Sequence, residues 1–337
     1  MKKVMILLLA GGLLLRGVAG AEVCMTQSQM TATERDGLAA TARNMAEKVQ
    51  GGDAAGLRAM TVAELRKDFR GVEAVVGESA PKLKGGTLTV TQVYVLDGSQ
   101  LKRSADGSAQ DAQFFCSLNK TAAEVDFLIP ALPAGRYGFA IVDSLGAATP
   151  LRLSLLLRQE EGKWALAGVY PKPVLAAGHD GLWYWTQARQ MVKANEPWNG
   201  WLYYQQAEIL LRPANFVRTT HLDKLLAEQS AAAPPPLSEG VTPEAPLVVK
   251  GLDGLEYHFT GLSVDDSLAK EKVDVIAHLK VEQIGDAAGA RKRNADAMRA
   301  LVTAYPEMRK AFHGIWVFSE APGQNPYPSE QAMSEIH

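Results

Sequence analysis

Two polar residues on predicted strands could take part in acid–base chemistry. Asp126 lies on the less apolar face of a strand predicted over residues 123–129, whose other face carries Val125 and Phe127. A carboxylate on the wall of an enclosed cavity can act as a general base, and Tyr94 could supply a second polar group there. The same pattern is typical of a strand whose outer face is open to water, and we prefer this interpretation for Asp126.

Seven aromatic residues gather within 22 positions in the middle of the chain: Trp183, Tyr184, Trp185, Trp198, Trp201, Tyr203 and Tyr204. Aromatic side chains contribute strongly to binding, so the cluster could form a platform for a sugar, a peptide or a partner protein. The candidate binding residues are Trp183, Trp185, Trp198, Trp201 and Tyr204. Trp183 and Trp185 fall on different faces of their predicted helix, which disfavours one common pocket. Burial of both faces between two parts of the protein is the interpretation that we prefer.

Sequence motifs give little support for catalysis or metal binding. Residues 117–120 and 267–270 match the S-x-x-K pattern of penicillin-binding enzymes, but the K-T-G partner motif is missing. His258 and His278 could be neighbours, yet two histidines without a third ligand make a poor metal site. We therefore predict no catalytic residue, no metal and no cofactor, and favour a binding protein over an enzyme.

The first 21 residues have the pattern of a secretory signal peptide. Lys2 and Lys3 precede an apolar stretch of twelve residues, 4–15, and small residues stand at positions 19 and 21. The apolar stretch is well below the roughly 20 residues that span a bilayer, and no other long apolar run follows. We expect cleavage after Ala21 and a periplasmic or secreted protein without a transmembrane segment.

The mature chain contains two cysteines, Cys24 and Cys116. An even pair in an oxidising compartment predicts one disulfide bond, which would join the mature N-terminus to the middle of a strand. Two independent thiols are the alternative. Lipid attachment at Cys24 is disfavoured, because bacterial lipoproteins resemble one another in carrying a Leu three residues before the cysteine, where this chain has Ala21.

Proline-rich segments divide the chain. Residues 231–246 carry five prolines and no aromatic residue, which is typical of a semi-rigid exposed linker. A softer boundary falls at residues 171–173, where strand-like sequence gives way to helical sequence. The predicted divisions are 1–21 (signal peptide), 22–173 (α+β roll), 174–230 (helical hairpin), 231–246 (linker) and 247–337 (small α+β domain).

The first division reads as helices followed by strands. Apolar residues at helical spacing end at Gly51-Gly52, and shorter helical stretches follow up to residue 76. From residue 86 the pattern alternates as in β-strands, with a change of phase that predicts a bulge or bend near Thr91. About six strands follow, so we predict an α+β fold with helices on one face of a curved antiparallel sheet.

Residues 30–173 resemble the cystatin-like α+β roll of nuclear-transport-factor-2-like and SnoaL-like domains. The resemblance rests on the stretches MAEKVQGGDAAGLRAM and LLLRQEEGKWALAGVYP, the second of which carries Gly162, Trp164 and Leu166. It implies a sheet that wraps around a cone beside the first helix. The family includes enzymes, ligand carriers and non-catalytic adaptors, so the resemblance leaves the function open.

The remaining divisions are predicted from local signals. Asp180 is a plausible N-cap for a helix, and Pro197 starts a second one, so residues 174–230 predict a helical hairpin packed on the roll. After the linker, Asp253-Gly254 between two β-like runs predicts a β-hairpin. A strand at residues 273–281, a helix and a last strand near residues 315–318 complete a small α+β domain.

These features predict an exported, non-catalytic binding or assembly protein. The formal charge of −2 and the single short basic cluster, residues 291–293, disfavour a nucleic-acid partner. One alternative is a small-molecule-binding or enzymatic domain that uses the cone of the roll. Another is a peptide- or protein-binding scaffold that uses the aromatic hairpin. The sequence specifies neither the partner nor the oligomeric state.

We expect the exported protein to begin at Glu22 and to weigh two hydrogens less than the reduced chain, because of cleavage after Ala21 and one disulfide. Intact mass before and after reduction and alkylation measures both features. A mass that begins at Cys24 with added acyl chains would instead identify a lipoprotein.

Overall fold

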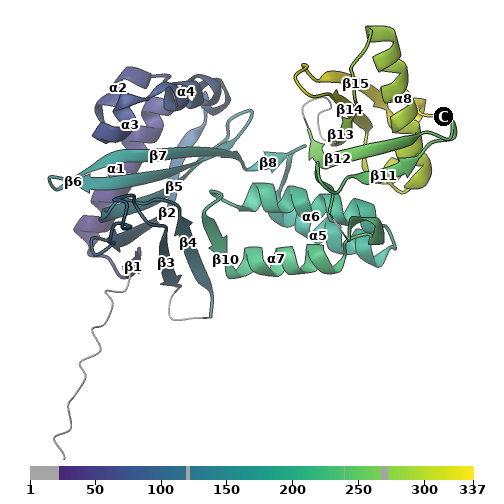
Figure 1. Ribbon diagram of the computed structural model, residues 1–337. Coiled ribbons are helices and arrows are strands. Elements are labelled where there is room, and N and C mark those ends of the chain that lie inside the picture. Colours follow the sequence, from purple (N-terminus) through teal and green to yellow (C-terminus); the bar gives the residue numbers. More distant parts are fainter. Residues whose placement is uncertain (1–22, 119–121, 239, 267–271) are drawn as a thin grey trace, which may run out of the picture.

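A computed structural model describes residues 23–118, 122–238, 240–266 and 272–337 as an α+β protein with several antiparallel sheets (Figure 1). The predicted signal peptide, part of the first S-x-x-K match (residues 117–120) and the whole of the second (residues 267–270) lie outside these residues. Within the described ranges, no helix combines the length and apolar character needed to cross a bilayer.

A five-stranded antiparallel sheet forms the centre of the N-terminal half. Its strands, in spatial order, are β1 (Val23–Thr26), β2 (Thr87–Gly98), β5 (Gly135–Leu145), β6 (Leu151–Glu160) and β7 (Lys163–Pro173). The bulge predicted near Thr91 is confirmed, because Val90 pairs with Val142 while Gln92 pairs with Ile141. One extra residue therefore bends β2 and increases the local twist of the sheet.

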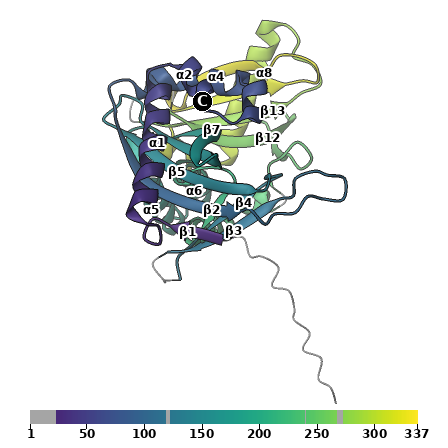
Figure 2. The same cartoon turned by 90° about the vertical axis from the view of Figure 1, so that its left-hand side faces the viewer.

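Helices cover one face of this sheet, as predicted. They are α1 (Ala32–Gln50), α2 (Ala54–Ala59), α3 (Ala63–Lys67) and α4 (Arg70–Leu83). The Thr31 hydroxyl caps α1 by accepting a hydrogen bond from the Glu34 amide at 3.2 Å, and Gly51 follows its last residue. Figure 2 shows α1 running across the strands. Leu38 and Met45 of α1 are fully buried in one apolar cluster with Leu155 of β6, so side chains fill the space between helix and sheet.

A smaller sheet covers the opposite face. Its strands, in spatial order, are β10 (Val217–Thr219), β4 (Glu124–Ile129) and β3 (Ala112–Ser117). Phe127 of this sheet packs edge-to-face on Phe139 of β5, with ring centroids 5.1 Å apart. The predicted run of strands therefore divides into two sheets, because β3 and β4 leave the large sheet and pair with β10 from beyond residue 200.

The predicted disulfide between Cys24 and Cys116 is present. Cys24 lies on β1 and Cys116 lies on β3, so the bond joins the first strand of the large sheet to the edge strand of the small sheet. Their Cα atoms are 5.2 Å apart and 92 positions apart in sequence.

Three helices follow the N-terminal half. They are α5 (Gly181–Lys193), α6 (Pro197–Leu211) and α7 (Thr220–Ala231), and the short strands β8 (Leu175–Ala176) and β9 (His179–Asp180) precede them. This hairpin contacts the N-terminal half, as predicted, because α6 lies beside β7 and the Ser154 hydroxyl of β6 donates to the Pro213 carbonyl oxygen at 2.9 Å. Its buried side chains share one apolar cluster with the C-terminal sheet, as the placement of α5 and α6 beside that sheet in Figure 1 also indicates. Leu237, within the predicted exposed linker, is buried in the same cluster and lies in a 3₁₀ turn (Pro235–Leu237).

The C-terminal sheet has five strands: β11 (Leu247–Lys250), β12 (Glu256–Asp265), β13 (Asp274–Lys280), β14 (Gly314–Glu320) and β15 (Tyr327–Ala332). The predicted hairpin at Asp253-Gly254 joins β11 and β12. Strands β13 and β14 pair in parallel, since the connection between them passes through α8 (Ala287–Ala304) and α9 (Met308–Ala311). The sequence did not predict β15. A second 3₁₀ turn (Met333–Glu335) follows it.

We expect removal of the disulfide to lower the free energy of unfolding by roughly 4 kcal/mol, because the bond restricts the unfolded chain over a long loop. Urea unfolding with and without dithiothreitol measures the loss. The double variant Cys24→Ser/Cys116→Ser is the matched control, and its unfolding midpoint should not respond to the reductant. Equal midpoints for reduced and oxidised wild-type protein would contradict the expectation.

Candidate functional site

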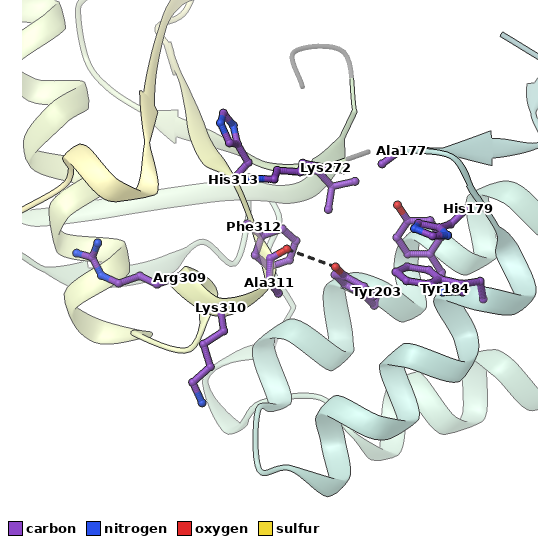
Figure 3. Close-up of a pocket in the computed structure, with 12 residues that line it drawn as sticks. Ala177, His179, Tyr184, Tyr203, Lys272, Arg309, Lys310, Ala311, Phe312 and His313 are labelled. Atoms are coloured by element: carbon purple, nitrogen blue, oxygen red, sulfur yellow. Dashed lines mark hydrogen bonds between the residues drawn. The ribbon is translucent and has the colours of Figure 1, made fainter. Parts of the chain in front are cut away.

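A cavity of about 280 Å³ lies where the helical hairpin meets the C-terminal sheet (Figure 3). One wall comes from the β8–β9 turn, α5 and α6, and the other comes from the two residues that precede β13, from α9 and from the two residues that follow α9. Its lining residues are Ala177, His179, Trp183, Tyr184, Tyr203, Lys272, Val273, Arg309, Lys310, Ala311, Phe312 and His313. Its volume is close to the lower end of the range for small-molecule sites.

Hydrogen bonds hold the two walls together. The Tyr203 hydroxyl donates to the carbonyl oxygen of Ala311 at 3.3 Å, as the dashed line in Figure 3 marks. The backbone N–H of Ala177 donates to a carboxylate oxygen of Asp266 at 2.7 Å. Ala177 and Gly178 have φ angles of +47° and +79°, which a two-residue turn of type I′ requires. The turn therefore fixes the adjacent wall of the cavity.

Local structure also positions the aromatic wall. Asp180 caps α5 by accepting a hydrogen bond from the Trp183 amide at 2.8 Å, as predicted for this N-cap. Trp183 in the first turn of α5 then stacks on His179, with ring centroids 3.7 Å apart and planes 7° apart. Tyr184 and Tyr203 complete this wall, and burial raises the pKa of Tyr203 to about 12. Both phenols therefore remain uncharged near neutral pH, since burial raises the pKa of Tyr184 as well.

The charged lining residues are basic. Lys310 pairs with Glu196 at 2.7 Å, and Arg309 donates to the carbonyl oxygens of Met333 and Ile336, both at 2.7 Å. Figure 3 shows both side chains directed away from Tyr203. Lys272 is exposed and has no ion-pair partner among the described residues. Its ammonium group is therefore the one of the three cationic groups that no described ion pair or hydrogen bond engages.

A buried carboxylate stands behind this wall. Asp274 is 1% exposed, and one of its oxygens lies 3.2 Å from Nδ1 of His313, which lines the cavity. Its other oxygen has no partner within the described part of the chain. Pairing with His313 stabilises Asp274, because a buried carboxylate without a partner is costly. The same contact holds the His313 ring in place.

The lining residues indicate which ligands the cavity could hold. Among the described residues that line it, none is an aspartate or glutamate, whereas His179, His313 and Lys272 are present. Aromatic rings in a lining that also includes a lysine suit a ligand with an apolar, planar body and a negative group.

Most residues of the aromatic cluster are buried, in line with the interpretation preferred from the sequence. Trp185, Trp198 and Tyr204 are 7%, 4% and 3% exposed, respectively. The indole N–H of Trp185 donates to Glu228 at 2.8 Å, and Trp198 packs on Tyr305 with ring centroids 4.0 Å apart. The half-buried residues Trp183 and Trp201 are the only other members of the candidate set. Of the five, Trp183 alone lines the cavity.

The structure does not bring Asp126 and Tyr94 together. Asp126 lies on the outer face of β4, where it accepts a hydrogen bond from Gln113 at 2.9 Å and stands opposite Arg218. Tyr94 packs against the inner face of the same small sheet, and its hydroxyl donates to Gln92 at 2.5 Å. Burial raises the pKa of Tyr94 to about 12. Asp126 of β4 and Tyr94 of β2 therefore lie on opposite sides of the small sheet.

Sequence reasoning missed most of the cavity lining. His179 and His313 were visible only as histidines at the edges of segments, and Lys272 carried no signal at all. Lys272 and His313 line the same cavity as His179 because β13 pairs with β14 and α9 packs beside α6. No local spacing in the sequence encodes those long-range contacts.

Glu228 of α7 holds the hairpin together, so we expect Glu228→Gln to lower the free energy of unfolding by about 2 kcal/mol at pH 7. Its carboxylate accepts hydrogen bonds from Arg189 at 2.7 and 2.9 Å and from Trp185 at 2.8 Å. Hydrogen bonding from Arg189 is the main reason that the pKa of Glu228 falls to about 2, with Trp185 lowering it further. The variant keeps the shape of the side chain and removes the charge.

The loss of unfolding free energy in Glu228→Gln should become smaller as the pH falls. A lowered pKa stabilises the fold above the unfolded-state value near 4.5, and this contribution disappears as the pH falls towards 2. Urea unfolding at several pH values, followed by tryptophan fluorescence, should show the variant approach the wild type in this window. Glu244→Gln, at an exposed position of the linker, is the matched control and should match the wild type throughout. A difference that does not change with pH would contradict the assignment.

Comparisons with known proteins complete the description of the site. No protein-family model, no curated protein and no solved structure matches this chain. Functional inference for this protein therefore rests on the side chains and contacts described above.

Proposed function

We propose that this chain is an exported, non-catalytic binding protein whose ligand site is the cavity between the helical hairpin and the C-terminal sheet. One observation carries the proposal: a stacked His179–Trp183 pair faces a wall that includes Lys272, and no described lining residue is acidic. The ligand that fits this lining is a small organic anion with a planar apolar body. Its carboxylate would approach Lys272, and its body would lie against the aromatic wall.

Export is supported by the disulfide and by the signal-like N-terminal sequence. The Cys24–Cys116 bond suits an oxidising compartment, as in the periplasm or outside the cell. Binding of an organic anion is supported by the stacked aromatic pair and by the basic residues of the lining. The two alternatives are less favoured, since apolar side chains fill the space between α1 and the large sheet and most of the hairpin aromatics are buried.

We also propose that residues 22–173 form a cystatin-like roll of the nuclear-transport-factor-2-like kind. The support is a long helix that crosses a bulged antiparallel sheet, with the consecutive strands β5, β6 and β7 paired as neighbours. Residues 247–337 would be a second unit. The helices between the two would belong structurally to the second, because they share its apolar cluster.

Benzoate is a suitable first probe, because it combines a planar ring with one carboxylate. We expect it to shift the indole N–H resonance of Trp183 in nitrogen-15 correlation spectra, with an affinity at least about tenfold higher than that of neutral benzamide. Trp183→Phe identifies the resonance.

Lys272→Gln should remove the preference for benzoate over benzamide, because it removes the cation and keeps a side chain of similar length. Lys250→Gln, at an exposed position of β11, is the matched control and should retain the preference. No shift of the Trp183 resonance with either probe, or equal affinity for both in the wild type, would overturn the proposal.

A further inference from the structure

A second hollow lies on the opposite half of the molecule, where the start of α1 meets the β6–β7 hairpin. This groove has a volume of about 610 Å³, and its lining includes Thr33, Glu34, Arg136, Gln159, Lys163 and Trp164. None of them lines the cavity near Lys272, so the groove is a separate candidate site.

Three planar polar side chains form one wall of the groove. Arg136 of β5 pairs with Glu34 of α1, with side-chain exposures of 29% and 21%, and also donates to the Gln159 side-chain oxygen at 3.3 Å. The three residues come from three different elements and hold one another in place. A ligand would therefore meet polar groups whose geometry is already fixed, which lowers the entropic cost of binding.

This wall retains hydrogen-bonding capacity. Among the described residues, no hydrogen-bond partner is present for the Glu34 carboxylate oxygen that does not contact Arg136. The same holds for the side-chain amide N–H groups of Gln159. They add an acceptor and donors on one wall, and the Thr33 hydroxyl lies on the helix side of the groove. The charges of Glu34 and Arg136 offset each other, so this wall suits a neutral, polar ligand, and the exposed Lys163 adds an ammonium donor at the hairpin end of the groove.

Trp164 supplies the apolar surface. It stands directly opposite Gln159 in the pairing of β6 with β7, so the two side chains lie on the same face of the sheet. The indole packs partly over Gly138, where an added Cβ would approach it to 3.4 Å, and it remains half-buried at the groove. Packing against the core thus fixes the ring and leaves part of it available for contact.

We propose that this groove binds a neutral saccharide. A sugar ring presents an apolar C–H face and a rim of vicinal hydroxyl groups, each of which both donates and accepts hydrogen bonds. The C–H face matches the indole of Trp164, and the hydroxyl rim matches the paired donors and acceptors of Gln159 and Glu34.

Maltotriose, cellotriose and tri-N-acetylchitotriose are the probes. We expect at least one of them to shift the indole N–H resonance of Trp164 saturably at millimolar concentration, while the Trp183 resonance does not move. The chain has six tryptophans, and Trp164→Phe identifies the relevant peak.

Gln159→Ala should weaken the binding of that saccharide about tenfold, because it removes hydrogen bonds to the hydroxyl rim. Gln190→Ala, at an exposed position of α5, is the matched control and should bind like the wild type. Thermal unfolding of each variant verifies that the fold is retained. No shift of the Trp164 resonance with any of the three sugars, or an unchanged affinity in Gln159→Ala, would overturn the proposal.

Discussion

Burial of α6 is the constraint on which the arrangement of the two halves depends. Side chains are buried around most of its circumference, which requires packing partners on several sides. Helices α5 and α7 supply part of the cover, and the C-terminal sheet supplies the rest through one continuous apolar cluster. Polar contacts then fix the orientation, as when Glu307 accepts a hydrogen bond from the Trp198 amide at 2.6 Å. The cavity beside Lys272 lies at the margin of this contact surface, where side chains do not fill the space between the hairpin and the C-terminal sheet.

Local signals predicted local structure well. The bulge at Thr91 followed from a change of phase within one strand, and the turn at Asp253-Gly254 followed from its residue types. The disulfide followed from the even number of cysteines and from the oxidising compartment that the signal-like sequence predicts. Pairing of β10 with β4 was not predictable in this way, because it joins segments about 90 residues apart and β10 has only three residues. The attachment of the hairpin to the C-terminal sheet is long-range in the same way. Strand β15 was missed for a different reason, because its sequence YPSEQA contains a proline and has no apolar alternation.

The aromatic cluster shows what composition reveals about a site. A concentration of tryptophan and tyrosine marks a large amount of apolar surface, and it predicts equally well an interface that is open and one that is already filled. Trp185 and Trp198 occupy the filled part, where each is nearly inaccessible. Trp183 lies at the edge of the same surface and faces the cavity. Which residue falls on which side depends on partners outside this segment, such as Glu228 for Trp185 and Tyr305 for Trp198, and no spacing within residues 183–204 encodes them.

Strand β10 has a consequence for any attempt to separate the two halves. It follows α6 in sequence, yet it completes the small sheet by pairing with β4. A fragment that ended at Pro173 would expose the backbone N–H and C=O groups of β4 along a new sheet edge, close to Leu128 and Phe115, which are already 39% and 60% exposed. Open edges beside apolar side chains are templates for aggregation. The N-terminal half therefore owes part of its solubility to three residues that the chain supplies only after the helical hairpin.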